Sequence, residues 1–212
     1  MRKAIIGIVT SLLGVPAWAE PITIAALGDS LTQGYGLAVE DGFVAQLQSW
    51  ADTQGVEVTL INAGVSGDTT ASGLSRAVWT LTPDVDAMIV ALGGNDLLRG
   101  IDPDVSRANL TGILEAAKTA DVKVLLIGMK APGNYGPEYK TRFDAIYPEL
   151  AAEFGMLYLD DFFTGFGEAV NDPASLRPLM QSDGIHPNPD GVKQIVAGIG
   201  PKLIELVGKT AD

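Results

Sequence analysis

The chain has 212 residues, of which 47% are hydrophobic and 19% charged, and it contains 25 glycines and 12 prolines. This composition is typical of a folded globular protein with many turns, not of a disordered chain or a coiled coil. The formal charge of −12, without a run of Lys or Arg, disfavours binding to nucleic acid or to an anionic membrane surface. The chain has no cysteine and one histidine, His186, which excludes disulfides, thiolate nucleophiles and metal sites built from several such side chains.

The first nineteen residues have the pattern of a secretory signal peptide. Arg2 and Lys3 precede an apolar run over residues 4–15, and the small residues Ala17 and Ala19 flank Trp18 at its end. The run is too short for a comfortable transmembrane span, although an uncleaved anchor or a buried first helix is the alternative interpretation. We expect cleavage after Ala19, which leaves a mature domain over residues 20–212 that is periplasmic or secreted and has no stable membrane insertion.

Downstream of this segment, strand-like and helix-like segments alternate. Short apolar and β-branched runs predict strands over residues 22–27, 56–61, 85–92, 122–129 and 156–159. Apolar residues at helical spacing predict helices over 43–53, 70–81, from Pro103 onward, over 138–154, and from Pro189 toward Val207 with a kink at Gly200-Pro201. The alternation indicates a single α/β domain, in which a doubly wound parallel sheet is covered by helices on both sides.

Polar clusters follow four of the predicted strand regions. The clusters are Gly28-Asp29-Ser30-Leu31, residues 62–68, Gly93-Gly94-Asn95-Asp96 and, after a long loop, residues 182–187. Because the carboxyl ends of parallel strands meet at one edge of a sheet, these clusters should converge there. Each also has a purely structural interpretation: an ordinary turn, a structural histidine before proline, or aspartates that accept from local backbone donors.

Together the clusters contain the groups that acyl transfer requires. A serine hydroxyl such as that of Ser30 is a weak nucleophile until a base takes its proton, and His186 is the only imidazole available. Asp183, three residues before it across a glycine turn, can hold the second ring nitrogen. The backbone N–H groups of Ser30 and Gly67 and the amide of Asn95 can supply donors for an oxyanion.

These four blocks resemble those of the SGNH (GDSL) hydrolase family, and the resemblance spans nearly the whole mature chain. It implies that Ser30 is the nucleophile, His186 the base and Asp183 its orienting acid. It assigns the oxyanion hole to the Ser30 N–H, Gly67 and Asn95. It also implies a flavodoxin-like, three-layer α/β/α fold with five parallel strands, and chemistry that uses no metal and no cofactor.

Within that family, residues 29–36, 62–70, 93–100 and 134–136 are similar to the exported thioesterase, lysophospholipase and arylesterase enzymes. Ala131 and Pro132 occupy the place where this subgroup commonly lines an acyl pocket, although their role can also be to shape the loop. The resemblance implies a serine esterase for small-molecule aryl or acyl esters, with thioesters and lysophospholipids as further substrates. A carbohydrate O-acetylesterase and a secreted binding module without turnover are the alternatives, and acyl-chain length and oligomeric state stay open.

Overall fold

A sheet of five parallel strands runs through the centre of the molecule, which a computed structural model describes for residues 21–210. The strand order is β2-β1-β3-β4-β5. The strands are β1 (Ile22–Gly28), β2 (Val58–Gly64), β3 (Ala87–Ala91), β4 (Lys123–Ile127) and β5 (Leu157–Leu159). The expected signal segment, residues 1–19, lies outside the described residues.

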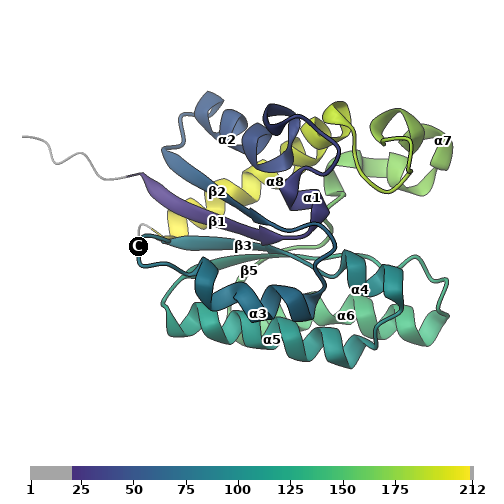
Figure 1. Ribbon diagram of the computed structural model, residues 1–212, viewed down its shortest axis with the longest axis horizontal. Coiled ribbons are helices and arrows are strands. Elements are labelled where there is room, and N and C mark those ends of the chain that lie inside the picture. The colour runs from purple at the N-terminus through teal and green to yellow at the C-terminus, as the bar shows by residue number, and fades with distance from the viewer. Residues whose placement is uncertain (1–20, 211–212) are drawn as a thin grey trace, which may run out of the picture.

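Helices cover both faces of this sheet (Figure 1). The helices α2 (Phe43–Thr53) and α8 (Pro189–Thr210) lie on one face. The opposite face carries α3 (Thr70–Thr80), α5 (Pro103–Thr119) and α6 (Pro137–Phe154). The predicted three-layer α/β/α domain is therefore confirmed, and its strand order is the flavodoxin-like one.

The core lies between the sheet and these two helical layers. All five residues of β3 are buried, because helices cover both of its faces. On α2, Phe43, Leu47 and Ala51 recur at four-residue spacing and are almost fully buried. Burying a leucine such as Leu47 stabilises the fold by roughly 1.5–3 kcal/mol, so this apolar stripe attaches α2 to the sheet.

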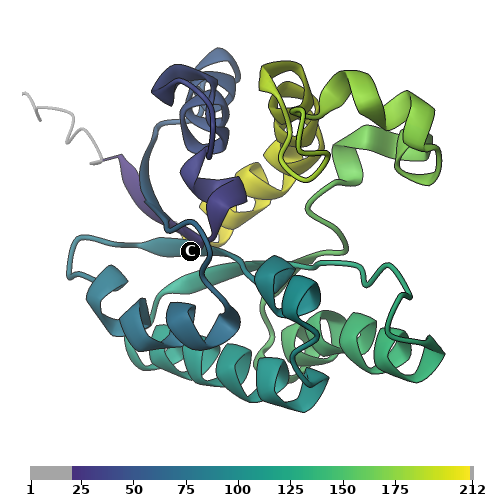
Figure 2. The same ribbon diagram turned by 45° about the vertical axis from the view of Figure 1, so that its right-hand side comes forward.

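The third and fourth strands, predicted over 85–92 and 122–129, are shorter in the structure, and two other predicted segments differ more. The second strand begins at Val58, not at residue 56, because the Val56 N–H bonds to the Ala51 carbonyl and completes the turn after α2. It then continues to Gly64, since this edge strand tolerates polar and exposed residues that broke the apolar pattern. The predicted long loop after β5 contains the short helices η2 (Thr164–Asn171), α7 (Pro173–Leu176) and η3 (Arg177–Leu179). Helices this short give no readable periodicity. In Figure 2 this segment lies across from α4 (Gly94–Arg99) and α6, above the carboxyl ends of the strands.

The direction of strand order reverses at β1, and this topological switch positions the polar clusters. The register pairs Gly28 of β1 with Gly64 of β2 and with Ala91 of β3, so the three strands end level. Parallel α/β sheets bind ligands in the crevice at such a switch point. Ser30, Gly67 and Asn95 all follow these three strand ends.

Candidate active site

Ser30 is the first residue of the one-turn helix α1 (Ser30–Gln33), immediately beyond β1. Asp29 caps this helix, because its Oδ1 accepts the N–H of Leu31 at 3.0 Å. Gly34 ends the helix in a left-handed conformation after a single turn. The short turn thus holds the Ser30 hydroxyl at the carboxyl edge of the sheet.

The loop before α8 brings an imidazole to this hydroxyl. His186 Nε2 lies 2.9 Å from Ser30 Oγ, and its Nδ1 lies 2.6 Å from Asp183 Oδ2. The other carboxylate oxygen, Asp183 Oδ1, accepts the N–H groups of Ile185 and His186 at 2.9 and 3.0 Å. Hydrogen bonds from the His186 N–H, the His186 ring and the Ile185 N–H lower the pKa of Asp183 to about 2. The structure therefore joins serine, imidazole and an ionised carboxylate in one chain of hydrogen bonds.

Two residues outside the predicted set support this imidazole. The ring of Tyr35 lies 4.7 Å from that of His186, centroid to centroid. Gln181 donates from Nε2 to the carbonyls of Tyr35 (2.8 Å) and Pro187 (3.0 Å), and its N–H donates to the His186 carbonyl (2.8 Å). Gln181 thereby fastens the histidine loop to the segment after α1. No local pattern identifies such a glutamine, because its role depends on two segments far apart in the sequence.

The expected oxyanion donors lie at the same edge. Gly67 has a φ of +84°, which a residue with a side chain rarely adopts, and it lines the same cavity as Ser30 and Asn95. Asn95, in the first turn of α4, donates from Nδ2 to the Asp68 carbonyl at 3.0 Å and to Asp29 Oδ2 at 3.3 Å. Both hydrogens of its amide thus face acceptors.

The backbone conformation and the close packing before α4 explain why residue 93 is a glycine. Gly93 has a φ of +119°, and a Cβ placed on it would come within 2.0 Å of the Tyr147 hydroxyl. That buried hydroxyl donates to the carbonyl of Leu92 at 2.9 Å, directly below the turn. The turn interpretation of this cluster is therefore correct for Gly93, while Asn95, two residues later, faces the cavity.

Asp29 carries a buried carboxyl group behind the serine. Its exposed fraction is 1%, and this desolvation raises its pKa to about 6, although the bonds from Leu31 and Asn95 oppose the shift. The local role expected for Asp29, accepting a nearby backbone N–H, is present. The carboxylate additionally accepts a hydrogen bond from the Asn95 amide.

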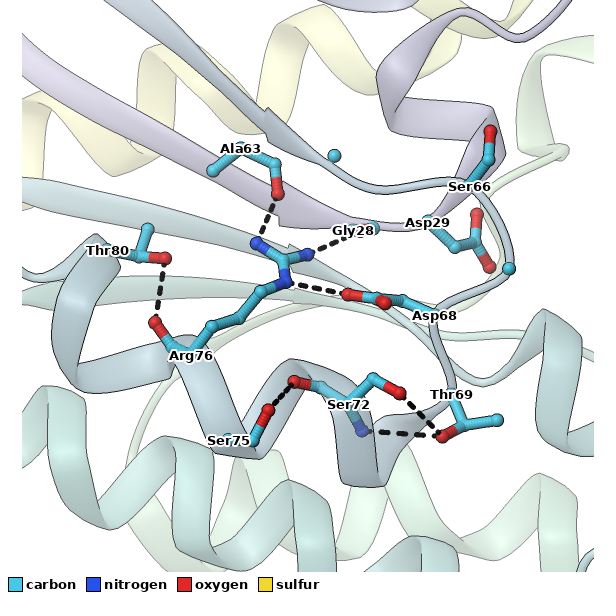
Figure 3. Close-up of polar contacts among 12 residues, drawn as sticks. Gly28, Asp29, Ala63, Ser66, Asp68, Thr69, Ser72, Ser75, Arg76 and Thr80 are labelled. Carbon is cyan, nitrogen blue, oxygen red and sulfur yellow. Dashed lines mark hydrogen bonds and ion pairs between the residues drawn. The ribbon is translucent and has the colours of Figure 1, made fainter.

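Asp68 differs from the expectation that it accepts local backbone donors. Its carboxylate instead forms an ion pair with Arg76 of α3, with 2.6 Å between Oδ2 and Nε. Figure 3 shows that the same guanidinium also reaches the carbonyls of Ala63 and Gly28, at 2.6 and 2.8 Å. One side chain therefore ties the ends of β1 and β2 to the loop that carries Gly67.

Asp96 is fully buried and acts as an anchor. Its carboxylate accepts the N–H of Thr70 (2.8 Å), the hydroxyl of Thr70 (2.6 Å) and the hydroxyl of Ser106 (2.9 Å). These bonds fix α4 against α3 and α5, so Asp96 has a structural role, but its donors lie on other helices and not in its own turn as expected. Within residues 21–210, no group of three or more His, Asp and Glu side chains is arranged to hold a metal ion.

A cavity of about 490 Å³ opens beside the serine. Its lining includes Tyr35 and Ile185 beside Ser30 and His186, and also Met129, Pro132 and Phe163, which follow the ends of β4 and β5. The structure separates the two residues expected in the acyl pocket. Pro132 lines the cavity, whereas Ala131 is 2% exposed, and its N–H and carbonyl bind Asp144 and Lys140 of α6. Ala131 therefore packs in the core and holds the loop in place.

Comparison with known families agrees with this geometry. Residues 26–194 match the model of the GDSL-like lipase/acylhydrolase family. The chain belongs to this family. The match includes Ser30, Gly67, Asn95, Asp183 and His186, so all the polar clusters at the sheet edge fall within the family region.

Individual members of the family align along most of their length. Esterase TesA of Pseudomonas aeruginosa is 33% identical over 208 residues, which cover 98% of this chain and 100% of the relative. The thioesterase 1/protease 1/lysophospholipase L1 of Escherichia coli K12 is 37% identical over 187 residues, which cover 87% of this chain and 85% of that enzyme. The crystal structure of AlinE4, an SGNH-hydrolase family esterase, superposes with a TM-score of 0.72 at 41% identity, covering 89% of this chain and 98% of that one.

Proposed function

We propose that this GDSL-like hydrolase cleaves carboxylic esters of small molecules through an acyl-enzyme on Ser30, with thioesters and lysophospholipids as further substrates. The observation that carries the proposal is the chain from Ser30 Oγ through the His186 ring to Asp183, with separations of 2.9 and 2.6 Å. Serine becomes nucleophilic when a neighbouring base can remove its proton, and this arrangement supplies that base.

His186 first accepts a proton and then donates it, while Asp183 stays ionised. His186 Nε2 takes the Ser30 proton as Oγ attacks the acyl carbonyl, and the Asp183 carboxylate stabilises the imidazolium that forms. The same ring then protonates the leaving alcohol or thiol, so that the acyl group stays on Ser30. Water deprotonated by His186 attacks this acyl-enzyme, the bond from the acyl carbon to Ser30 Oγ breaks, and His186 returns the proton to Oγ as the acid is released.

The tetrahedral intermediate needs donors for its oxyanion, and we assign them to the N–H groups of Ser30 and Gly67 and to Asn95 Nδ2. The longer of the two amide bonds of Asn95, at 3.3 Å to Asp29, is the weaker one. An oxyanion takes over this hydrogen, while the 3.0 Å bond to the Asp68 carbonyl keeps the amide in place. Asn95 then stabilises the transition state more than the bound substrate.

The lining of the cavity favours esters of longer acyl chains over acetate esters such as acetylated carbohydrate. Its arm beyond the serine includes the apolar side chains of Met129, Phe163 and Val170, which suit an acyl chain longer than acetyl. An acetyl xylan esterase structure superposes with a TM-score of 0.70 but at 22% identity, which shows a shared fold alone.

A hydrolysis screen tests this function. Nitrophenyl esters of increasing chain length should be cleaved, and acetylated xylan should release much less acetate per enzyme under the same conditions. Ser30→Ala serves as the control for background hydrolysis and should abolish turnover. Preferential release of acetate from xylan would support the O-acetylesterase instead, and an inactive wild type across both substrates would support the binding module.

We also propose that the mature enzyme is periplasmic or secreted, on the basis of Arg2, Lys3 and the apolar run that ends in Ala17-Trp18-Ala19. Within residues 21–210, no helix is long and apolar enough to cross a membrane. N-terminal sequencing of protein recovered from a periplasmic extract or the medium should start at Glu20. A cytosolic protein that starts at Met1 would contradict this location.

A further inference from the structure

The lining of the cavity beside Ser30 includes a charged group that the hydrolytic chemistry does not use. Asp161, two residues past β5, lines the cavity together with the apolar side chains of Met129, Phe163 and Val170. Ser30 follows β1, and β3 and β4 lie between β1 and β5. Because neighbouring strands are spaced about 4.8 Å apart, the two residues lie roughly 14 Å apart along the sheet edge.

The lysine near Asp161 forms its ion pair with a different carboxylate. Lys130 also lines the cavity, but its Nζ pairs with the exposed carboxylate of Asp160 at 2.5 Å. Asp161 Oδ1 accepts the N–H of Phe163 at 3.1 Å, which fixes the carboxyl group in the turn after β5. Burial raises the pKa of Asp161, although the hydrogen bond from the Phe163 N–H and the charge of Lys130 act in the opposite direction. The far end of the arm is therefore an incompletely solvated carboxyl group.

The direction of the acyl chain follows from the catalytic groups. The leaving atom must lie near His186 Nε2 to receive its proton, and the carbonyl oxygen must face Gly67 and Asn95. The acyl chain takes the remaining direction, along the arm lined by Met129 and Phe163 toward Asp161.

We propose that Asp161 is a specificity-determining residue that limits the length of the acyl chain, an inference that rests on the proposed esterase function. Each methylene that enters the apolar part of the arm favours binding by about fourfold. A chain long enough to reach Asp161 has to strip water from the carboxylate without offering it a hydrogen bond, which is unfavourable. Lengthening the acyl chain beyond the point where it reaches Asp161 therefore no longer improves binding.

The test compares kcat/KM for nitrophenyl esters from butanoate to dodecanoate in two variants. Asp161→Leu replaces the carboxylate with an apolar group of similar size and should raise the dodecanoate-to-butanoate ratio on the order of tenfold, equivalent to about two further methylenes. Asp161→Asn keeps an acceptor for the Phe163 N–H and should raise the ratio in the same direction by less. Glu168→Leu removes a charge from an exposed site in the same segment and should leave the ratio unchanged.

Butanoate serves as the internal reference because its short chain does not reach Asp161. Retained butanoate hydrolysis with an unchanged ratio in Asp161→Asn and Asp161→Leu would overturn the assignment. If Asp161→Leu fails to fold, the ratio in Asp161→Asn decides alone. A wild type that is inactive on every ester would refute the esterase function itself, and the assignment of Asp161 with it.

Discussion

Replacing Arg76 with methionine should destabilise the protein strongly, although Arg76 does not line the cavity. Its guanidinium forms an ion pair with Asp68 at 2.6 Å and donates to the carbonyls of Ala63 (2.6 Å) and Gly28 (2.8 Å). The side chains of Arg76 and Asp68 are 22% and 12% exposed, so water reaches the pair poorly. Methionine keeps the apolar stem but removes the donors to the Asp68 carboxylate and the Ala63 carbonyl, while the Gly28 carbonyl still accepts the N–H of Val65 at 3.1 Å.

The magnitude follows from these contacts. Removing one partner of a buried ion pair costs about 3–5 kcal/mol, because the other charge stays buried and unpaired. Since this pair is slightly exposed, we expect a loss of about 3 kcal/mol in the free energy of unfolding. The loss of the tie between the β strands and the Gly67 loop should also lower kcat on a short-chain ester.

Urea unfolding of the wild type and Arg76→Met measures this loss, and Arg107→Met is the matched control. Arg107 pairs with Glu149 at the surface, where the side chains are 32% and 59% exposed, so the same substitution should cost less than about 1 kcal/mol. Adding Asp68→Asn to Arg76→Met should recover part of the loss, because it removes the unpaired charge. A cost for Arg76→Met no larger than that of Arg107→Met would refute this reasoning.

Three further predictions concern the groups around the serine. Asn95→Ala should lower kcat by about 10²–10³ with little change in KM, and Asn95→Asp should be at least as damaging because its carboxylate faces the oxyanion. Steady-state kinetics on one short-chain ester measure both effects, and a fully active Asn95→Asp would show that Asn95 is not part of the oxyanion hole. His186→Ala, in a chain with no second histidine, should lose about 10³-fold or more in kcat while remaining folded by circular dichroism, and activity within tenfold of wild type would contradict the base assignment. The raised pKa of Asp29, about 6 against 3.8 when unfolded, contributes stability that is present below pH 3.8 and lost as the pH rises through 6. Asp29→Asn should remove about 3 kcal/mol of this pH dependence in urea unfolding, and an unchanged slope between pH 4 and 7 would count against the buried carboxyl.

The sequence predicts the layers and the edge of the site because both follow from regular patterns. Buried strands are short apolar runs, and amphipathic helices such as α2 repeat their apolar residues at helical spacing. In a parallel sheet every strand ends at the same edge, so the polar clusters that follow the first, third and fifth strands are enough to expect that Ser30, Asn95 and His186 meet there. The structure places Ser30 and His186 within hydrogen-bond distance.

The remaining features depend on contacts that no local pattern contains. In the sequence, Arg76 cannot be distinguished from any other polar residue of an amphipathic helix. Its role depends on contacts with the ends of β1 and β2 in the folded protein. Ala131 and Pro132 are adjacent in sequence, yet only Pro132 of the two lines the cavity, because Asp144 of α6 binds the Ala131 N–H. Asp161 lies in a segment without periodicity, and its position at the end of the cavity depends on the strand order.

Mapping the residue that a serine-directed phosphonate modifies tests the central claim, that Ser30 is activated by His186 and carries the acyl group. We expect a single adduct per chain by intact mass, located on the peptide that contains Ser30, with loss of esterase activity in proportion to labelling. Ser30→Ala should take up no adduct, and His186→Ala should label much more slowly because its Ser30 has no base. Undiminished hydrolysis by Ser30→Ala, or complete inhibition with the adduct on another residue, would contradict the mechanism.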